Sequence, residues 1–265
     1  MTVPLDLDGT VAVLTGAGSG IGRAVALSLA ARGARIVASD VGDERAGETA
    51  ALVKSAGGDA IGVRVDVSQQ GELEELRDRA LDAFGRIDLV MNNVGVLAMG
   101  PPESLPLEAW HRVLDLNLLS VARSNLVFLP HLLAQGSGHV VNTASASGLL
   151  AYGYDRLPYV ASKHAVVGVS EAMAIYLAPK GIGVTCVCPS GVITNILEQI
   201  TVYGEPTSPR APQHALVEPA AVGELVADAV TAGTFLVVTA PEIHDELRER
   251  ATDTEAYLQR VIGEQ

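Results

Sequence analysis

The sequence predicts a single α/β domain, spanning residues 1–265, in which helices cover both faces of a mostly seven-stranded parallel sheet. Three observations support this prediction. Short runs rich in β-branched residues recur along the chain, segments with helical periodicity separate the early runs, and most runs are apolar on both faces instead of alternating. Strands that are apolar on both faces are typical of a parallel sheet buried between two helical layers. Strands that alternate with helices at this spacing indicate a doubly wound fold.

Seven segments are expected to form the strands, and in chain order they are 11–14, 35–39, 61–65, 87–91, 140–142, 184–187 and 235–239. A helix is expected between the third and fourth strands, because apolar side chains recur three, seven and eleven positions after Leu73. That spacing places them on one stripe of a helix.

Two segments depart from this alternation. Residues 195–217 contain three prolines and no clear period, which is typical of a loop that contacts substrate. Residues 241–262 predict an amphipathic helical extension, which a capping box at 252–255 could divide into two helices. The extension is interpreted as a packing helix, a subunit contact or a cover for the site.

Composition excludes several classes of function. The chain carries 31 acidic residues against 18 Lys and Arg, whereas nucleic-acid binding needs clustered basic residues. No run approaches the roughly 18 uninterrupted apolar residues of a membrane-spanning helix, and the N-terminus has no signal-peptide pattern. We expect Cys186 and Cys188 to point to opposite faces of a strand and therefore not to pair. A reduced, cytoplasmic protein is indicated.

A glycine-rich loop, Thr15-Gly16-Ala17-Gly18-Ser19-Gly20-Ile21-Gly22, follows the first predicted strand and opens a helix. A pyrophosphate needs backbone amides that no side chain obstructs, at the positive end of a helix dipole. The strand before the loop and the helix after it are what distinguish a dinucleotide site from a plain glycine-rich turn. The residues expected to contact the cofactor here are Gly16, Ser19, Gly20, Ile21 and Gly22.

An acidic residue, Asp40, ends the second predicted strand. A carboxylate at this place can accept hydrogen bonds from both hydroxyls of an adenosine ribose, and it repels a 2′-phosphate. Ser19 in the glycine loop is not basic, so the two residues favour NAD over NADP. The alternative is that Asp40 only caps the next turn.

Tyr159 and Lys163 lie one helical turn apart on the same face of a predicted helix. A tyrosine normally titrates near pH 10, and a neighbouring cation favours the phenolate. The pair therefore suits general acid/base chemistry, although a tyrosine at an interface with a lysine extending to solvent would look the same. Hydroxyl groups follow the strand 140–142, and spacing does not choose between Thr143, Ser145 and Ser147.

Asn117 interrupts the apolar stripe of the helix that follows Pro106. A buried amide is costly unless it is hydrogen-bonded. Asn117 is therefore either a member of a structural network or part of a proton relay.

Together these motifs resemble the classical short-chain dehydrogenases/reductases (SDR) over residues 8–195. The TGxxxGxG loop of that family corresponds to residues 15–22, its NNAG strand end to 92–95, and its PGxVxT segment to 189–194. The resemblance implies further cofactor-binding residues, and these are Asp66, Val67, Asn93, Gly95, Val192 and Thr194, with Tyr159 and Lys163.

The resemblance also implies a catalytic tetrad. Tyr159 would be the acid/base, Lys163 would bind the nicotinamide ribose and depress the tyrosine pKa, and Ser145 would orient the substrate oxygen. Asn117 would hold a water in a proton relay. Ser145 is chosen because the serine of the family stands three residues before a glycine, here Gly148.

The chain departs from the family pattern in three places. Ser190 replaces a glycine, one extra residue separates Ser145 from Tyr159, and the C-terminus lacks the glycine-rich ending that many relatives use in tetramer contacts. We expect a homo-oligomer, either a tetramer or a dimer.

The expected function is hydride transfer between NAD and a hydrophobic secondary alcohol or ketone. The candidate substrate residues are mostly apolar, with no matched Arg or Lys to clamp an anion, and they are Val96, Leu97, Ala98, Met99, Leu149, Leu150, Tyr152, Ile196, Leu197, Ile200 and Tyr203. The alternatives are an NADPH-dependent ketoreductase of the same fold and a non-catalytic, cofactor-sensing protein. No metal is expected, because none of the six His residues has partners at ligand spacing.

Overall fold

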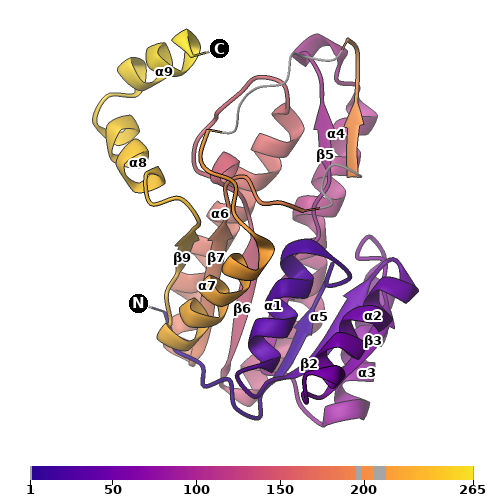
Figure 1. The fold of residues 1–265 in the computed structure, drawn as a ribbon. Coiled ribbons are helices and arrows are strands. Elements are labelled where there is room, and N and C mark those ends of the chain that lie inside the picture. The colour runs from indigo at the N-terminus through magenta and orange to yellow at the C-terminus, as the bar shows by residue number, and fades with distance from the viewer. Residues whose placement is uncertain (1, 195–198, 206–212, 265) are drawn as a thin grey trace.

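The computed structural model describes residues 2–194, 199–205 and 213–264. Within these residues, seven parallel strands form one sheet in the order β3-β2-β1-β4-β6-β7-β9 (Figure 1). The doubly wound parallel fold predicted from the sequence is confirmed. The strands are β1 Val11–Leu14, β2 Arg35–Asp40, β3 Ala60–Arg64, β4 Leu89–Asn92, β6 Gly138–Thr143, β7 Ile182–Cys188 and β9 Leu236–Val238.

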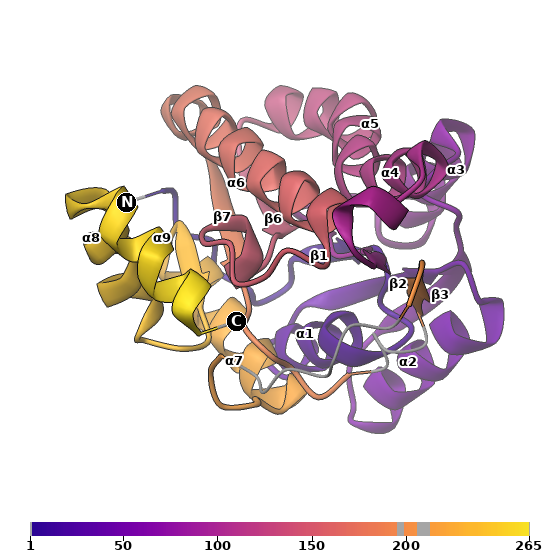
Figure 2. The ribbon, with the colours of Figure 1, turned by 90° about the horizontal axis from the view of Figure 1, so that it is seen from above.

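Helices cover both faces of this sheet (Figure 2). One layer contains α1 Gly20–Ala30, α2 Asp43–Ser55 and α7 Pro219–Ala232. The other layer contains α3 Gln70–Phe84, α5 Ser120–Gln135 and α6 Leu157–Leu177. Each layer forms its own apolar core against the sheet. The central strands are buried on both faces, which is why their sequences do not alternate between apolar and polar residues.

The order of the strands determines where a ligand site can lie. Strand β1 pairs with β2 on one side and with β4 on the other, so the chain reverses its direction across the sheet next to β1. The loops that leave the carboxyl ends of β1 and β4 therefore diverge to opposite faces and leave a crevice between them. Ligands of open α/β sheets bind in such a crevice.

A helical run from Leu107 to Gln135 connects β5 Leu97–Met99 to β6. It comprises α4 Leu107–Leu114, a π-helical turn Asp115–Leu119, and α5. By length and composition alone this run could cross a membrane. In this fold it packs beside the sheet, with Phe128 and Leu132 buried in the core.

The segment 195–217, predicted to be irregular, contains a short strand, β8 Ile200–Val202, which pairs in parallel with β5. Three residues carry too little local signal to be recognised, and the strand exists because β5 lies beside it. Residues 195–198 and 206–212 lie outside the described residues; they include Ile196, Leu197 and the three prolines of the predicted loop.

The C-terminal extension forms two helices, α8 Ile243–Thr252 and α9 Thr254–Gly263. The expected division is confirmed, but the capping residue is Asp253, whose carboxylate accepts the N–H of Ala256 at 2.9 Å. Figure 1 shows both helices (yellow) beyond β9.

The expectation for the two cysteines is wrong. Cys186 and Cys188 lie two positions apart on β7, so they share one face of the sheet, since side chains alternate with a period of two. Their Sγ atoms are 3.8 Å apart, both residues are buried, and both are free thiols.

His139 gives the fold a testable pH dependence. It is fully buried on β6, with Nε2 at 2.8 Å from the Thr185 hydroxyl, which itself donates to the Thr234 carbonyl. Burial lowers the pKa of His139 to about 4. The histidine of the unfolded chain titrates near 6.5. Between pH 6.5 and pH 4 it is therefore protonated, whereas His139 of the folded chain stays neutral.

We expect the free energy of unfolding to fall by about 2 kcal/mol through this residue alone between pH 7 and pH 5. Urea titrations of the protein and of His139→Gln at both pH values measure it. The variant should be less stable at pH 7 and should lose less stability on acidification. Equal losses in the two proteins would show that His139 does not titrate in this way.

Candidate active site

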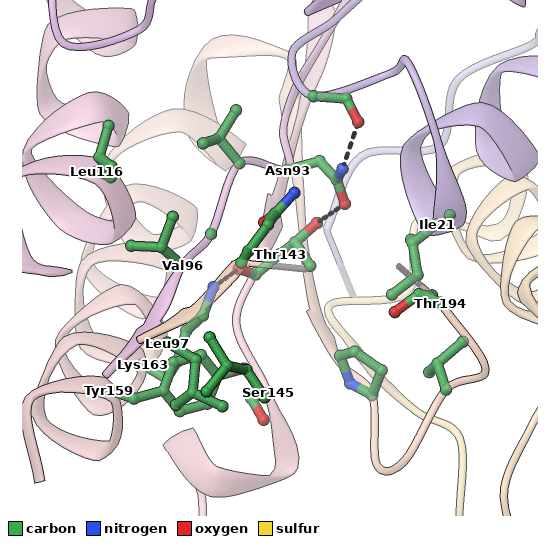
Figure 3. A pocket seen from close by; sticks show the side chains of 18 of the residues that line it. Ile21, Asn93, Val96, Leu97, Leu116, Thr143, Ser145, Tyr159, Lys163 and Thr194 are labelled. Atoms are coloured by element: carbon green, nitrogen blue, oxygen red, sulfur yellow. Dashed lines mark hydrogen bonds between the residues drawn. The ribbon is translucent and has the colours of Figure 1, made fainter. Parts of the chain in front are cut away.

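A cavity of about 1080 Å³ lies at the carboxyl ends of the strands. One end is lined by Asp40 and Asp66, and another part by Ser145, Tyr159 and Lys163. Figure 3 shows that these last three residues come together from the loop after β6 and from helix α6. The structure thus brings the predicted cofactor residues other than Gly22, and three of the four predicted catalytic residues, into one cavity.

The glycine loop forms one wall of this cavity. Gly16 and Gly20 have positive φ values of 60° and 51°, a conformation that other residues adopt at a cost. Gly22 differs from the expectation, because it does not line the cavity. A Cβ atom there would lie 2.2 Å from the Gly16 carbonyl oxygen. Gly22 therefore allows helix α1 to pack closely on the loop.

Asn93 clamps the glycine loop to the neighbouring strand. Its Nδ2 donates to the Gly16 carbonyl at 3.0 Å, and its Oδ1 accepts from the Thr143 hydroxyl at 3.2 Å (Figure 3). The residue lines the cavity, but these contacts give it the role of fixing the loop. They also engage the Thr143 hydroxyl, one of the three candidates for the substrate-orienting group, by using its proton.

Asp40 has several partners at the adenosine end of the expected cofactor site. Its carboxylate accepts the N–H groups of Gly18 at 3.1 Å and Gly42 at 2.9 Å, and pairs with Arg45 at 2.9 Å. The turn-capping interpretation is therefore realised, and it coexists with a place on the cavity wall. Sequence reasoning missed Arg45, although it lies five residues after Asp40 at the start of a helix.

The second acidic position lies at the same end. Asp66 lines the cavity with Val67 and accepts the N–H of Ser68 at 2.9 Å. The backbone N–H of Asp66 donates to Glu72 at 2.7 Å. These bonds hold the turn after β3 in place beside Asp40.

Lys163 is buried and donates from Nζ to the Thr143 carbonyl at 2.8 Å (Figure 3). Burial lowers its pKa to about 8. Its Nζ is 5.7 Å from the centre of the Tyr159 ring.

The expectation that Lys163 depresses the Tyr159 pKa is not met in this structure. Burial raises the pKa of Tyr159, while a hydrogen bond from Ser145 and the charge of Arg156 oppose that rise. The ammonium group lies over the ring and is directed to a carbonyl, so it does not act on the phenol oxygen directly.

Ser145 is positioned by a short 3₁₀ helix, Ala146–Gly148. Its hydroxyl oxygen accepts the N–H of Ser147 at 3.1 Å and so caps that turn. A Cβ atom on Gly148 would lie 2.5 Å from the Lys163 carbonyl oxygen. The glycine three residues after Ser145 therefore lets this loop rest directly on helix α6, which sets the placement of Ser145 against Tyr159.

This contact carries a prediction. The substitution Gly148→Ala should push the loop away from α6, since the atom that a new Cβ would meet belongs to rigid backbone. We expect kcat to fall by roughly 10- to 100-fold, because misplacement of a reacting group by about 1 Å can cost that much. Steady-state kinetics and a thermal melt would test this. The matched control is Gly168→Ala on helix α6, because no atom lies near the Cβ position of Gly168. Equal effects of the two substitutions would contradict the argument.

Asn117 lies in the π-helical turn and is almost completely buried. Its Oδ1 accepts from the Val96 N–H at 2.8 Å, and its Nδ2 donates to the Val96 carbonyl at 3.1 Å and to the Ser162 hydroxyl at 3.0 Å. The structural-network interpretation is thus realised, and Asn117 does not line the cavity. The network ties the start of β5 to helix α6 next to Lys163.

The segment 189–194 forms the wall opposite the catalytic residues. Val192 and Thr194 line the cavity, and a Cβ atom on Gly20 would lie 3.1 Å from Thr194. Figure 3 shows Thr194 near Ile21. Ser190, which departs from the family pattern, has its own partner: its N–H and hydroxyl lie 2.9 Å and 2.8 Å from the Thr239 hydroxyl. That bond fastens the segment to the end of β9.

The predicted substrate residues divide into two groups. Val96, Leu97, Met99, Tyr152 and Ile200 line the cavity, as does Leu116, which sequence reasoning missed. The others that are described do not line it, and these are Ala98, Leu149, Leu150 and Tyr203.

The expectation of no basic residue near the substrate needs correction. Arg112 and Arg156 both line the cavity. Arg156 is held by the buried Asp155, with Nε at 2.8 Å and Nη2 at 3.3 Å from its two carboxylate oxygens. This adjacent ion pair compensates the Arg156 charge. A signal was present in the sequence, because Arg156 stands three residues before Tyr159.

The comparisons with known proteins agree with this geometry. The family model for "short chain dehydrogenase" matches residues 10–202. Cyclohexanol dehydrogenase from Acinetobacter sp. (strain SE19) is 37% identical over 191 residues, covering 71% of this chain and 75% of that protein. D-beta-hydroxybutyrate dehydrogenase from Cupriavidus necator is 31% identical over 231 residues, covering 87% and 86%.

Among solved structures, a short chain dehydrogenase/reductase from Burkholderia phymatum in complex with NAD superposes with a TM-score of 0.85 at 34% identity, covering 95% of this chain and 96% of that one. Both the fold and the sequence match therefore extend across the cavity and its motifs. The chain belongs to the short-chain dehydrogenase/reductase family of oxidoreductases, whose members use NAD or NADP.

Proposed function

We propose that this protein is an NAD-dependent dehydrogenase that interconverts hydrophobic secondary alcohols and ketones, with Tyr159, Lys163, Ser145 and Asn117 as its tetrad. The observation that carries the proposal is the wall beside Ser145 and Tyr159. There the cavity is lined by Val96, Leu97, Met99 and Leu116, and the nearby Arg156 is compensated by Asp155. An apolar lining with a few placed polar groups is typical of a site for a neutral ligand.

The residues of the cavity fit a dinucleotide. The glycine loop leaves the N-terminus of α1 clear of side chains, and that helix end favours a pyrophosphate. Asp40 lines the cavity at the carboxyl end of β2, where a carboxylate accepts ribose hydroxyl groups and repels a 2′-phosphate. The related structure with NAD supports the same cofactor here.

The nicotinamide, when bound, supplies or accepts the hydride. In the direction of oxidation, Tyr159 takes the proton of the carbinol hydroxyl, and in reduction it returns that proton. Ser145, capped by the Ser147 amide, donates to the substrate oxygen and fixes its distance from the phenol. Lys163 places a buried ammonium group beside the phenol and the expected ribose position.

In this assignment Asn117 acts by positioning the residues to which it is hydrogen-bonded. Its three hydrogen bonds fix Val96, which follows Gly95, and Ser162, which precedes Lys163. A Cβ atom on Gly95 would lie 3.3 Å from Nζ of Lys163. A π-helical turn of this kind is frequent at functional sites. We assign Asn117 to ordering the proton relay that begins at Lys163.

The substrate class is tested by measuring NADH formation with cyclohexanol and larger ring alcohols alongside 3-hydroxybutyrate. The names of the two relatives represent these two classes, a neutral ring alcohol and a hydroxy acid. We expect the neutral alcohols to be the better substrates by kcat/KM. Turnover of hydroxy acids alone would overturn the proposal and would assign Arg156 or Arg112 to binding their carboxylate.

We further propose that the protein is a homo-oligomer. Large apolar side chains are exposed on the outer faces of α5 and α6, with Leu126 67% and Ile175 79% exposed. The two helices are neighbours, since Asn125 donates to the Met173 sulfur at 3.3 Å. Burying such side chains in a contact stabilises it by about 1.5–3 kcal/mol each.

We expect the double variant Leu126→Glu, Ile175→Glu to lower the molar mass measured by size-exclusion chromatography with light scattering. Leu52→Glu, on helix α2 in the other layer and 42% exposed, should leave that mass unchanged. A monomeric parent protein, or a double variant of unchanged mass, would contradict this interface.

We propose a cytoplasmic location. The chain carries only two cysteines, whereas cysteine-rich chains are typical of oxidising compartments.

A further inference from the structure

A polar group of residues faces the cavity from the side of the C-terminal helices. Tyr152 and His214 both line the cavity, and their rings meet edge to face, with centroids 5.5 Å apart and planes at 83°. Glu246 on α8 lies behind them, with Oε1 at 2.9 Å from Nε2 of His214. These three residues, which we call the polar wall, come from three separate segments of the chain.

The charge on Glu246 determines how His214 is oriented. A carboxylate can only accept hydrogen bonds, so Nε2 of His214 must carry the proton that lies between them. In the neutral imidazole the other ring nitrogen, Nδ1, is then an acceptor. His214 is almost fully shielded from solvent, with its side chain 6% exposed. Because Nε2 is engaged by Glu246, Nδ1 is the ring nitrogen of His214 that is left for a ligand in the cavity.

The Glu246 carboxylate also lies close to Tyr152. Burial, and then the charge of Glu246, raise the pKa of the Tyr152 phenol, so that it stays protonated at neutral pH. An anionic group arriving at this wall would meet that carboxylate. The polar wall is thus suited to a neutral ligand that can form a hydrogen bond.

The C-terminal helices hold Glu246 in place. Ile243 of α8 and Tyr257 of α9 are buried against Ala146 and Leu150, in the loop that follows Ser145. Arg250 donates to the Leu149 carbonyl at 2.7 Å. Arg260 of α9 pairs with Glu249 of α8 at 2.8 Å, which ties the two helices together. A carboxylate fixed in this way orients its partners without a large loss of entropy on binding.

We propose that the polar wall is a specificity subsite that binds a second hydroxyl group of the substrate, with Nδ1 of His214 as its hydrogen-bond partner and Glu246 as the residue that positions His214. The inference rests on the proposed function and narrows its substrate class to ring alcohols that carry another hydroxyl group away from the reacting carbon. The C-terminal extension was interpreted as a packing helix, a subunit contact or a cover for the site. The proposal favours the cover.

The test compares matched pairs of substrates with purified full-length protein and NAD. Each pair is a ring alcohol and its diol, such as cyclohexanol with the cyclohexanediol whose second hydroxyl lies on the opposite ring carbon, and the corresponding decalin alcohols. At least one diol should exceed its mono-alcohol in kcat/KM by roughly tenfold, through a lower KM, as expected for one hydrogen bond to a buried partner.

The substitutions His214→Leu and Glu246→Ala should reduce this preference to about twofold or less, with kcat for the mono-alcohol unchanged. Asp245→Asn removes the neighbouring carboxylate on α8, which is 82% exposed and pairs with Arg248, and it should keep the full preference. The rise in Tm that NAD produces should be the same in all four proteins, which verifies that the fold and the cofactor site are intact.

Two results would overturn the subsite. One is a parent protein whose kcat/KM is no higher for the diol than for the mono-alcohol in any pair. The other is a loss of kcat/KM in the variants that is equal for mono-alcohol and diol. Failure of the proposed function looks different, because the parent protein would then bind NAD without oxidising any neutral alcohol.

Discussion

Replacing Tyr159 by phenylalanine should abolish turnover while NAD still binds. In the proposed mechanism the phenol, which lines the cavity with Ser145, exchanges a proton with the substrate oxygen, and its removal leaves the ring to fill the same space. General acid/base catalysis contributes about 10²- to 10⁴-fold, so we expect kcat to fall by at least 100-fold. Steady-state assays with the best alcohol from the screen measure this loss.

The rise in Tm on adding NAD is the control for this substitution. Ligand binding raises stability by RT ln(1 + [L]/Kd), about 2.7 kcal/mol when the ligand is at 100 times Kd. The variant should keep most of that rise. Retained turnover in Tyr159→Phe would refute the catalytic assignment, and a parent protein that binds NAD but turns over no alcohol or ketone would favour a cofactor-sensing function.

The pH profile adds a second test of the same residue. Burial raises the pKa of Tyr159 and lowers that of Lys163 to about 8. A phenol with a raised pKa loses its proton only at high pH, so oxidation of the alcohol should become faster as pH rises.

Replacing Asp40 by asparagine should shift cofactor preference toward NADP. The parent protein should bind NAD more tightly, because the carboxylate repels the 2′-phosphate. The amide removes that charge and releases Arg45, which now lies 2.9 Å from the carboxylate, to pair with the phosphate. We expect the ratio of NADP to NAD affinity to rise by about 100-fold, equivalent to about 2.7 kcal/mol.

Thermal-shift titrations with both cofactors measure this ratio directly, and kcat/KM for each cofactor provides a second measure. The double variant Asp40→Asn, Arg45→Ala separates the two contributions, because it should lose part of the gain for NADP. A parent protein that prefers NADP would make the reductase the better assignment, and an unchanged ratio in Asp40→Asn would remove Asp40 as the selecting residue.

The sequence by itself determined the parallel sheet and the motifs along it. Each strand needs only a few consecutive apolar residues to be recognised, and the glycine loop requires backbone conformations that Gly16 and Gly20 adopt readily. The positions of Tyr159 and Lys163 one turn apart on α6 follow from helix geometry alone. These features are local in the chain, so local patterns reveal them.

Tertiary contacts decided what each residue does within the site. Asn93 and Gly22 are part of the expected cofactor motif, yet one clamps the loop and the other permits close packing of α1. Only the folded chain shows that Lys163 is directed to the Thr143 carbonyl. It also shows that burial dominates the pKa of Tyr159, because burial depends on every element around the site.

Tertiary contacts also decided the substrate side of the cavity. Strand β8 exists through its pairing with β5, and the compensation of Arg156 by Asp155 depends on how the turn before α6 folds. The polar wall joins residues 152, 214 and 246, which no sequence spacing connects. Chemistry carried by one segment can be read from the sequence, whereas specificity built from several segments is determined only when the chain folds and brings them together.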